Sequence, residues 1–209
     1  MKVICISGKA QHGKDTTAGY LKEFLEEKGN KVLIAHYGDL VKYVCKTFFA
    51  WDGVKDEKGR SILQRVGTDI IRRQLPNYWV DFICGILILF PDEWDYVLIP
   101  DCRFPNEIKN MEVFFDVTHI RVIRENFVSP LTEEQQKHPS ETALDDYGAD
   151  VEIINRGNLD ELRRAIETLV NSIVIGETVS CIFTANSGAK NEFTEAEAVK
   201  FWAEADTNG

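Results

Sequence analysis

Short apolar runs rich in Val and Ile alternate with stretches of helical periodicity along most of the chain. We expect strands at 2–6, 31–35, 96–100, 117–123 and 151–154. Apolar residues recurring every three or four positions predict helices at 14–28, 40–49, 61–75, 79–89, 107–114 and 158–173. This alternation is typical of a parallel sheet covered by helices on both faces. The pattern therefore predicts an α/β fold, with one domain over residues 1–175.

The pattern changes at about residue 176, where small and polar residues replace the apolar runs. Thr194 and Glu197 have capping-box spacing and predict one short helix. We treat 176–209 as a C-terminal appendage. Within the domain, the segment 125–142 lacks clear periodicity and could fold over a ligand as a lid. A mobile loop without such a role is the alternative.

The charge of the chain limits the classes of function. Its 209 residues carry a formal net charge of −10, which argues against nucleic acid as a partner because phosphate neutralisation needs a basic face. No apolar run is long enough to span a membrane, and we expect a cytoplasmic protein. Five dispersed cysteines without a C-x-x-C pair predict reduced, mostly buried thiols. The sequence leaves open whether the chain forms a homodimer.

The segment from Gly8 to Thr16 has the spacing G-x-x-x-x-G-K of a phosphate-binding loop. It follows the first expected strand and opens the first expected helix, which is the context that the motif requires. Backbone N–H groups and the helix N-terminus would face the phosphates, and the lysine would reach the outer ones. We therefore expect ATP, bound as a complex with Mg²⁺. The residues expected to contact it are Gly8, Ala10, Gln11, His12, Gly13, Lys14, Asp15, Thr16 and Thr17.

Asp15 stands where most such loops carry Ser or Thr, whose hydroxyl binds the magnesium ion. Thr16, or water held by Asp101 or Asp15, would then position the metal. Asp101 and Arg103 follow a strand, at the edge where ligands of open α/β sheets bind, and Arg103 could hold a phosphate. A structural ion pair between these two residues is the alternative.

Further charged residues are candidates for binding a second, phosphorylated ligand. Arg65 and Arg72 lie seven apart on an expected helix and would share one face. Asp39 and Lys42 could contact the acceptor, although a helix cap with an i,i+3 ion pair explains them equally well. Glu141 lies in the lid candidate. Asn155 and Gly157 end the fifth strand, where they could face an adenine or form a simple turn.

Several segments together resemble a known family. They are Gly13-Lys14-Asp15-Thr16, Gln64-x-x-Gly67-Thr68, Trp79-Val-Asp81, Asp101-Cys-Arg103-Phe-Pro-Asn-Glu107 and His138-Pro-Ser-Glu141. This combination resembles the deoxynucleoside monophosphate kinases of bacteriophages and bacteria. The resemblance covers about residues 2–169 and implies a P-loop kinase core with strand order 2-3-1-4-5. It also implies ATP and magnesium as donor and a deoxynucleotide as acceptor.

We expect transfer of the γ-phosphoryl group of ATP to a deoxynucleoside 5′-monophosphate. Lys14, Arg72, Asp101 and Arg103 would be the catalytic residues, and Asp39, Lys42, Arg65, Arg72, Arg103 and Glu141 would bind the acceptor. Two alternatives stay open. One is a kinase for another small phosphorylated acceptor, because phosphomevalonate kinases share the Gly-Lys-Asp loop start. The other is a regulatory protein that binds ATP without catalysis.

Overall fold

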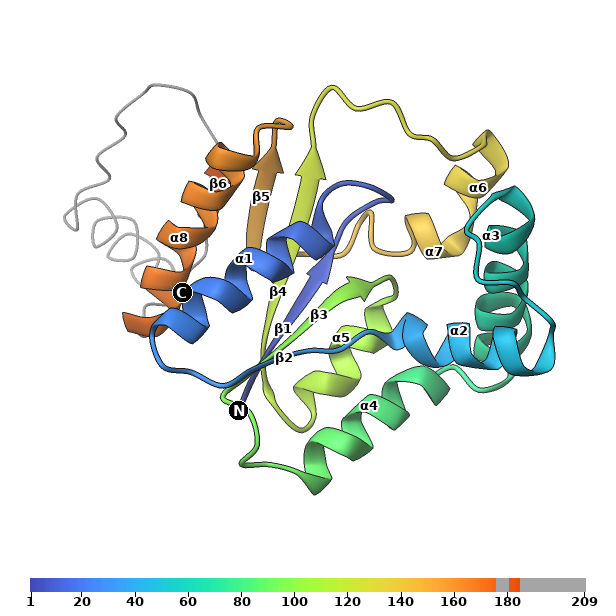
Figure 1. Ribbon diagram of the computed structural model, residues 1–209, viewed down its shortest axis with the longest axis horizontal. Coiled ribbons are helices and arrows are strands. Elements are labelled where there is room, and N and C mark those ends of the chain that lie inside the picture. Colours follow the sequence, from blue (N-terminus) through green and yellow to red (C-terminus); the bar gives the residue numbers. More distant parts are fainter. Residues whose placement is uncertain (176–180, 185–209) are drawn as a thin grey trace, which may run out of the picture.

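The computed structural model describes residues 1–175 and 181–184, in which six parallel strands form one sheet of order β2-β3-β1-β4-β5-β6 (Figure 1). The strands are β1 Lys2–Ser7, β2 Val32–Ile34, β3 Tyr96–Cys102, β4 Asp116–Arg124, β5 Val151–Asn155 and β6 Cys181–Thr184. The helices are α1 Lys14–Glu27, α2 Tyr37–Phe48, α3 Glu57–Gln64, α4 Tyr78–Leu89, α5 Pro105–Glu112, α6 Glu133–Lys137, α7 Pro139–Thr142 and α8 Leu159–Ile175. A π-helix, η1 Arg65–Arg72, continues α3.

The expected order of five strands, 2-3-1-4-5, is confirmed. A sixth strand, β6, pairs in parallel with β5 and comes from the segment that the sequence analysis treated as an appendage. Part of that segment therefore extends the sheet. The helix expected to open at Thr194 lies outside the described residues.

Alternating side chains of the central strand enter two separate cores, as a sheet covered on both faces requires. Ile4 and Ile6 pack with α1 and α8 on one face, whereas Val3 and Cys5 pack with α4 and α5 on the other. Figure 1 shows α1 and α8 on one side of the strands and α4 and α5 on the other. The sheet thus holds the carboxyl ends of its strands, and the loops that follow them, on a rigid support.

Two glycines of the phosphate loop are required by their backbone conformation and by close neighbours. Gly8 has φ 140°, and a Cβ there would lie 2.3 Å from the Val122 carbonyl oxygen. Gly13 has φ 104°, and its Cβ would lie 2.8 Å from Asn155 Nδ2. Both φ values are costly for residues with a side chain. The loop therefore forms where the sequence predicts it.

The helix expected at 61–75 begins earlier and is not regular. Asp56 caps it by accepting a hydrogen bond from Gly59 N at 2.7 Å, and its second half is η1. Trp79 Nε1 donates to the Gly67 carbonyl at 3.0 Å in the buried interior. A Cβ on Gly67 would lie 3.0 Å from Val41 Cγ1, so the helix packs closely on α2. π-Helical turns often occur at functional sites.

In the described part of the chain, no helix combines the length and apolar character needed to cross a membrane. Four of the five cysteines fall in the segments whose side chains are described, namely Cys5, Cys45, Cys84 and Cys102. All four are buried free thiols, as expected.

We predict that Trp79→Phe lowers the free energy of unfolding by about 1–3 kcal/mol, because the buried Gly67 carbonyl would lose its partner. Urea unfolding followed by circular dichroism measures the change. Tyr78→Phe is the matched control, because Tyr78 is 45% exposed, and we expect it to unfold like the wild type. Equal stabilities of the two variants would contradict the role of the Trp79 hydrogen bond.

Candidate active site

The phosphate loop, the end of β3 and the helices α2, α3 and η1 enclose a cleft of about 430 Å³. Its volume is within the range of small-molecule sites. Among the described residues, its cationic side chains are Lys14, Lys42, Lys55, Arg60, Arg72 and Arg103. Its carboxylates are Asp15, Asp101, Glu107 and Glu141. The acidic chain thus gathers cations locally at this cleft.

Lys14 lies inside the phosphate loop, where its ammonium donates to the carbonyls of Gly8 at 2.7 Å and Lys9 at 2.8 Å. Burial, together with the like charge of Arg103, lowers the pKa of Lys14 to about 8, while Glu141 opposes the shift. A bound anion would favour the charged form. The lysine is therefore placed to respond to phosphate.

Arg103 is bound by the segment that the sequence analysis identified as a lid candidate. Its guanidinium forms an ion pair with Glu141 and donates to the Ser140 carbonyl at 3.0 Å. The other carboxylate oxygen of Glu141 accepts a hydrogen bond from Ala10 N, in the phosphate loop, at 3.0 Å. Glu141 therefore connects Arg103 with the loop, and the ion pair between Asp101 and Arg103 that the sequence left open as an alternative is not found among the described residues.

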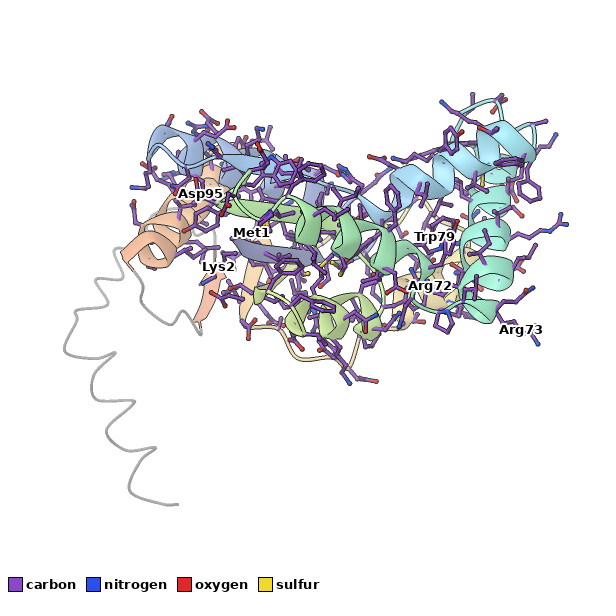
Figure 2. The ribbon with its side chains drawn as sticks, turned by 90° about the horizontal axis from the view of Figure 1, so that it is seen from below. Met1, Lys2, Arg72, Arg73, Trp79 and Asp95 are labelled. Atoms are coloured by element: carbon purple, nitrogen blue, oxygen red, sulfur yellow. The ribbon has the colours of Figure 1, made fainter. Side chains whose placement is uncertain are left out.

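Glu107 is a buried carboxylate that contacts the side chain of Arg72 and the backbone of Arg103. Its side chain is 1% exposed and accepts hydrogen bonds from Arg103 N and from Phe104 N at the start of α5. It also pairs with the Arg72 guanidinium, which lies 4.1 Å from the centre of the Phe104 ring. Figure 2 shows Arg72 close to Trp79, whereas Arg73 extends from the outer end of the molecule. Arg72 thus reaches the cleft as predicted.

Asp101 anchors the start of α2. Its two carboxylate oxygens accept hydrogen bonds from Tyr37 N at 3.0 Å and Gly38 N at 2.8 Å. Burial raises the pKa of Asp101, and the two amides oppose that shift because they favour the charged form. Asp101 thus fixes the start of α2 against the end of β3, at the wall of the cleft.

Asp15 and the start of α2 meet at His36. His36 Nε2 lies 3.3 Å from Asp15 Oδ1, and its Nδ1 lies 3.6 Å from Asp39 Oδ2. The hydrogen bond with Asp15 raises the pKa of His36, and the same bond lowers the pKa of Asp15. Asp39 also pairs with Lys42 at 2.6 Å, so the i,i+3 ion pair that the sequence left open is present. Lys42 lines the cleft and Asp39 does not.

A second hollow of about 250 Å³ lies on the other side of the loop. Asn155 and Gly157 line it together with Gly13, Thr16 and Arg124. Asn155 Nδ2 donates to the His12 carbonyl at 2.9 Å, and Gly157 N donates to Asn155 Oδ1 at 2.8 Å. The end of the fifth strand therefore lies beside the phosphate loop, and the hydrogen bond between Asn155 and Gly157 forms the turn that the sequence left open.

Three side chains that the sequence analysis expected to contact a ligand, those of His12, Thr17 and Arg65, do not line the cleft. Thr17 is fully buried, so its side chain cannot contact a nucleotide. His12 Nδ1 accepts from Arg124 N at 3.1 Å, so the ring faces the segment after β4. Arg65 is exposed and does not line the cleft. Residues seven apart share a face of an α-helix, but the i→i+5 hydrogen bonds of η1 hold more residues per turn and turn Arg65 away.

The site residues predicted from the sequence did not include His36, Lys55 and Arg60, which line the cleft, and the motif residues Gln64 and Thr68 were given no role in it. Lys55 and Arg60 form no ion pair within the described residues. Partial burial is the main cause that lowers the pKa of Lys55, and the like charge of the nearby Lys42 lowers it as well. The Asp56 cap could have revealed that the helix starts at Glu57, which places Arg60 and Gln64 on one face.

The oxygen donors of the cleft fit a magnesium ion carried by a nucleotide. Magnesium commonly takes one or two protein carboxylates and completes its shell with phosphate oxygens and water. Asp15 and Asp101 line the cleft, and the Asp15 side chain is 83% exposed. Thr16, the other expected metal contact, lines the second hollow instead. Within 1–175 and 181–184 no group of three His, Cys, Asp or Glu side chains could hold a metal alone.

The parallel sheet, the glycine-rich loop before α1 and the cationic cleft beside it define a P-loop protein of the nucleotide-binding α/β class. Comparison with known proteins gives the family. A family model described as deoxynucleotide monophosphate kinase matches residues 50–166, and the chain belongs to this family.

Two curated relatives are deoxynucleotide monophosphate kinases of phages. The protein of Escherichia phage RB69 is 29% identical over 113 residues, 53% of this chain and 44% of the relative. The protein of Enterobacteria phage T4 is 31% identical over 105 residues, 49% of this chain and 41% of the relative. The match thus spans less than half the length of either relative.

Among solved structures, the Mycobacterium tuberculosis APS kinase CysC in complex with AMPPNP and APS is similar with a TM-score of 0.46 and 15% identity. The similarity covers 82% of this chain and 98% of that one. This likeness is distant, and the sheet order of the chain itself defines the fold.

We predict that the affinity for ATP falls as the pH rises above about 8. Phosphates near Lys14 favour its charged form and raise its pKa above about 8, so binding takes up a proton in this range. Below about pH 8 Lys14 is already charged in the free protein, so its protonation no longer changes the affinity for ATP with pH. Calorimetry in two buffers of different ionisation enthalpy measures the uptake. Equal proton uptake by the wild type and Lys14→Met at about pH 8.5 would contradict the assignment.

Proposed function

We propose that the protein transfers the γ-phosphoryl group of MgATP to the 5′-phosphate of a deoxynucleoside monophosphate, giving ADP and the diphosphate. The main support is that one cleft joins the phosphate loop to a group of cations, namely Arg103 next to the loop and Lys55, Arg60 and Arg72. Such a cleft can hold two anionic ligands together. The family membership supports a deoxynucleotide as the acceptor.

On the donor side, the loop amides and Lys14 would hold the phosphates of ATP, and the hollow beside Asn155 would hold its base. This arrangement points the terminal phosphate into the cleft. Magnesium, when bound, would neutralise part of the phosphate charge, and Asp15 is the exposed carboxylate positioned to hold its water shell.

On the acceptor side, Lys55 and Arg60 would bind the 5′-phosphate. Arg72 and Arg103 would stabilise charge that spreads over the transferred group. The acceptor phosphate has its second pKa near 6 and is already anionic at neutral pH. It attacks the γ-phosphorus directly while ADP leaves, so no strong general base is required.

The first test is incubation of the full chain with ATP, magnesium and each deoxynucleoside monophosphate, with the products separated by chromatography. We expect ADP and one or more deoxynucleoside diphosphates, and Lys14→Ala should lower turnover about a hundredfold or more. ATP binding without diphosphate formation would favour the regulatory protein. Turnover of phosphomevalonate but of no deoxynucleotide would favour the other kinase.

We further predict that Lys55→Gln lowers kcat/KM for the acceptor at least about tenfold, because a charge-assisted hydrogen bond contributes about 1.5–3 kcal/mol. The KM for ATP should change little, and Lys55→Arg should restore part of the loss. Lys58→Gln is the matched control, because Lys58 lies three residues after Lys55, is exposed on α3 and does not line the cleft. Equal kinetics of the Lys55 and Lys58 glutamine variants would exclude Lys55 from acceptor binding.

A further inference from the structure

The carboxylate of Glu141 is bound by two groups that would otherwise bind phosphate. One oxygen accepts the hydrogen bond from Ala10 N in the phosphate loop at 3.0 Å. The other forms the ion pair with Arg103. The side chain of Glu141 is 7% exposed, so the carboxylate is held within the protein. The phosphate loop and Arg103 together therefore fix the position of the Glu141 carboxylate.

A carboxylate in this position offers the same chemistry as a phosphate oxygen. Backbone N–H groups and the guanidinium fork bind either anion through charge-assisted hydrogen bonds. Since Ala10 N has one hydrogen to donate, it cannot bind Glu141 and a phosphate at full strength together. Glu141 and a ligand phosphate would thus compete for the loop amide and for Arg103.

Neighbouring contacts connect this carboxylate with both sides of the cleft. Glu141 belongs to α7, which His138 caps by accepting from Ser140 N at 3.2 Å. His138 Nε2 also lies 3.4 Å from Asp69 Oδ1 of η1, on the acceptor side. Lys9 of the phosphate loop pairs with Asp145, just after α7, at 3.0 Å. Release of Glu141 would therefore loosen a segment that touches both the loop and η1.

We propose that Glu141 is a specificity-determining residue that occupies the place of a substrate phosphate at Arg103 and the phosphate loop. Only a ligand with a phosphate dianion displaces it, whereas water or a nucleoside without phosphate does not. This inference rests on the proposed function for the identity of the ligands. The phosphate comes either from ATP or from the acceptor, and the two sources are distinguished by experiment.

Removing the charge of Glu141 should change the affinity for the ligand in opposite directions, depending on whether Glu141 competes with the ligand or only positions Arg103. If Glu141 only holds Arg103 in place for the ligand, removing its charge weakens ligand binding. If Glu141 competes with the ligand, removing its charge strengthens binding, because a larger fraction of the protein is then ready to bind. A protein whose binding-ready fraction is about one tenth would gain up to about tenfold in affinity.

The experiment is isothermal calorimetry of wild type and Glu141→Gln, with a non-hydrolysable ATP analogue in one arm and a deoxynucleoside monophosphate in the other. We expect one of the two ligands to bind Glu141→Gln at least about fivefold more tightly. That ligand is the source of the competing phosphate. The matching nucleoside without phosphate should show no gain. Glu134→Gln, an equal charge change on exposed α6, should bind both ligands like the wild type.

Unchanged or weaker binding of both ligands by Glu141→Gln overturns the proposal, and so does an equal gain in Glu134→Gln. Thermal melting checks that the variant is folded. If it is not, Glu141→Asp takes its place, since the shorter side chain loosens both contacts and should also strengthen binding. Binding is measured without turnover, so a protein that makes no diphosphate would disprove the proposed function and leave this test intact.

Discussion

Among the residues that the structure describes, six cationic side chains line one cleft of a chain whose formal charge is −10, and holding them near one another is the constraint on which the site depends. Carboxylates offset the repulsion. Arg72 pairs with Glu107, Arg103 with Glu141 and Lys42 with Asp39. Glu107 is buried, so losing it would leave Arg72 without a partner in a poorly solvated position. These carboxylates are therefore as necessary to an anion site as the cations themselves.

The paired and unpaired cations would serve different purposes. A cation fixed by a carboxylate and by the backbone has a defined position, as Arg103 has through Glu107, Glu141 and Ser140. Lys55 and Arg60 have no ion pair in the described part of the chain, so their charge is available to a ligand. A dianion that binds between the two groups would relieve repulsion on both sides at once. Charge alone thus favours binding of a phosphorylated ligand over a neutral one.

Strands and the phosphate loop were predictable from the sequence because periodicity and glycine spacing are local signals. The strand order came from the family resemblance and is confirmed. Helices α6 and α7 were missed because five and four residues are too few to show a period. Arg65 was misplaced because η1 is not an α-helix, a feature that no local pattern reveals. Arg60 reaches the cleft through the packing of α3, and Lys55 reaches it from the segment just before that helix.

The need to offset charge in the cleft also explains the contact between Asp15 and His36. A carboxylate in place of the usual hydroxyl adds negative charge beside a polyphosphate, which is unfavourable unless a cation offsets it. His36 lies 3.3 Å from Asp15, and this contact raises the pKa of the imidazole, which favours its charged form beside the carboxylate. A magnesium ion would supply further positive charge. Because His36 stands at the start of α2, the compensation also ties the phosphate loop to the acceptor side of the cleft.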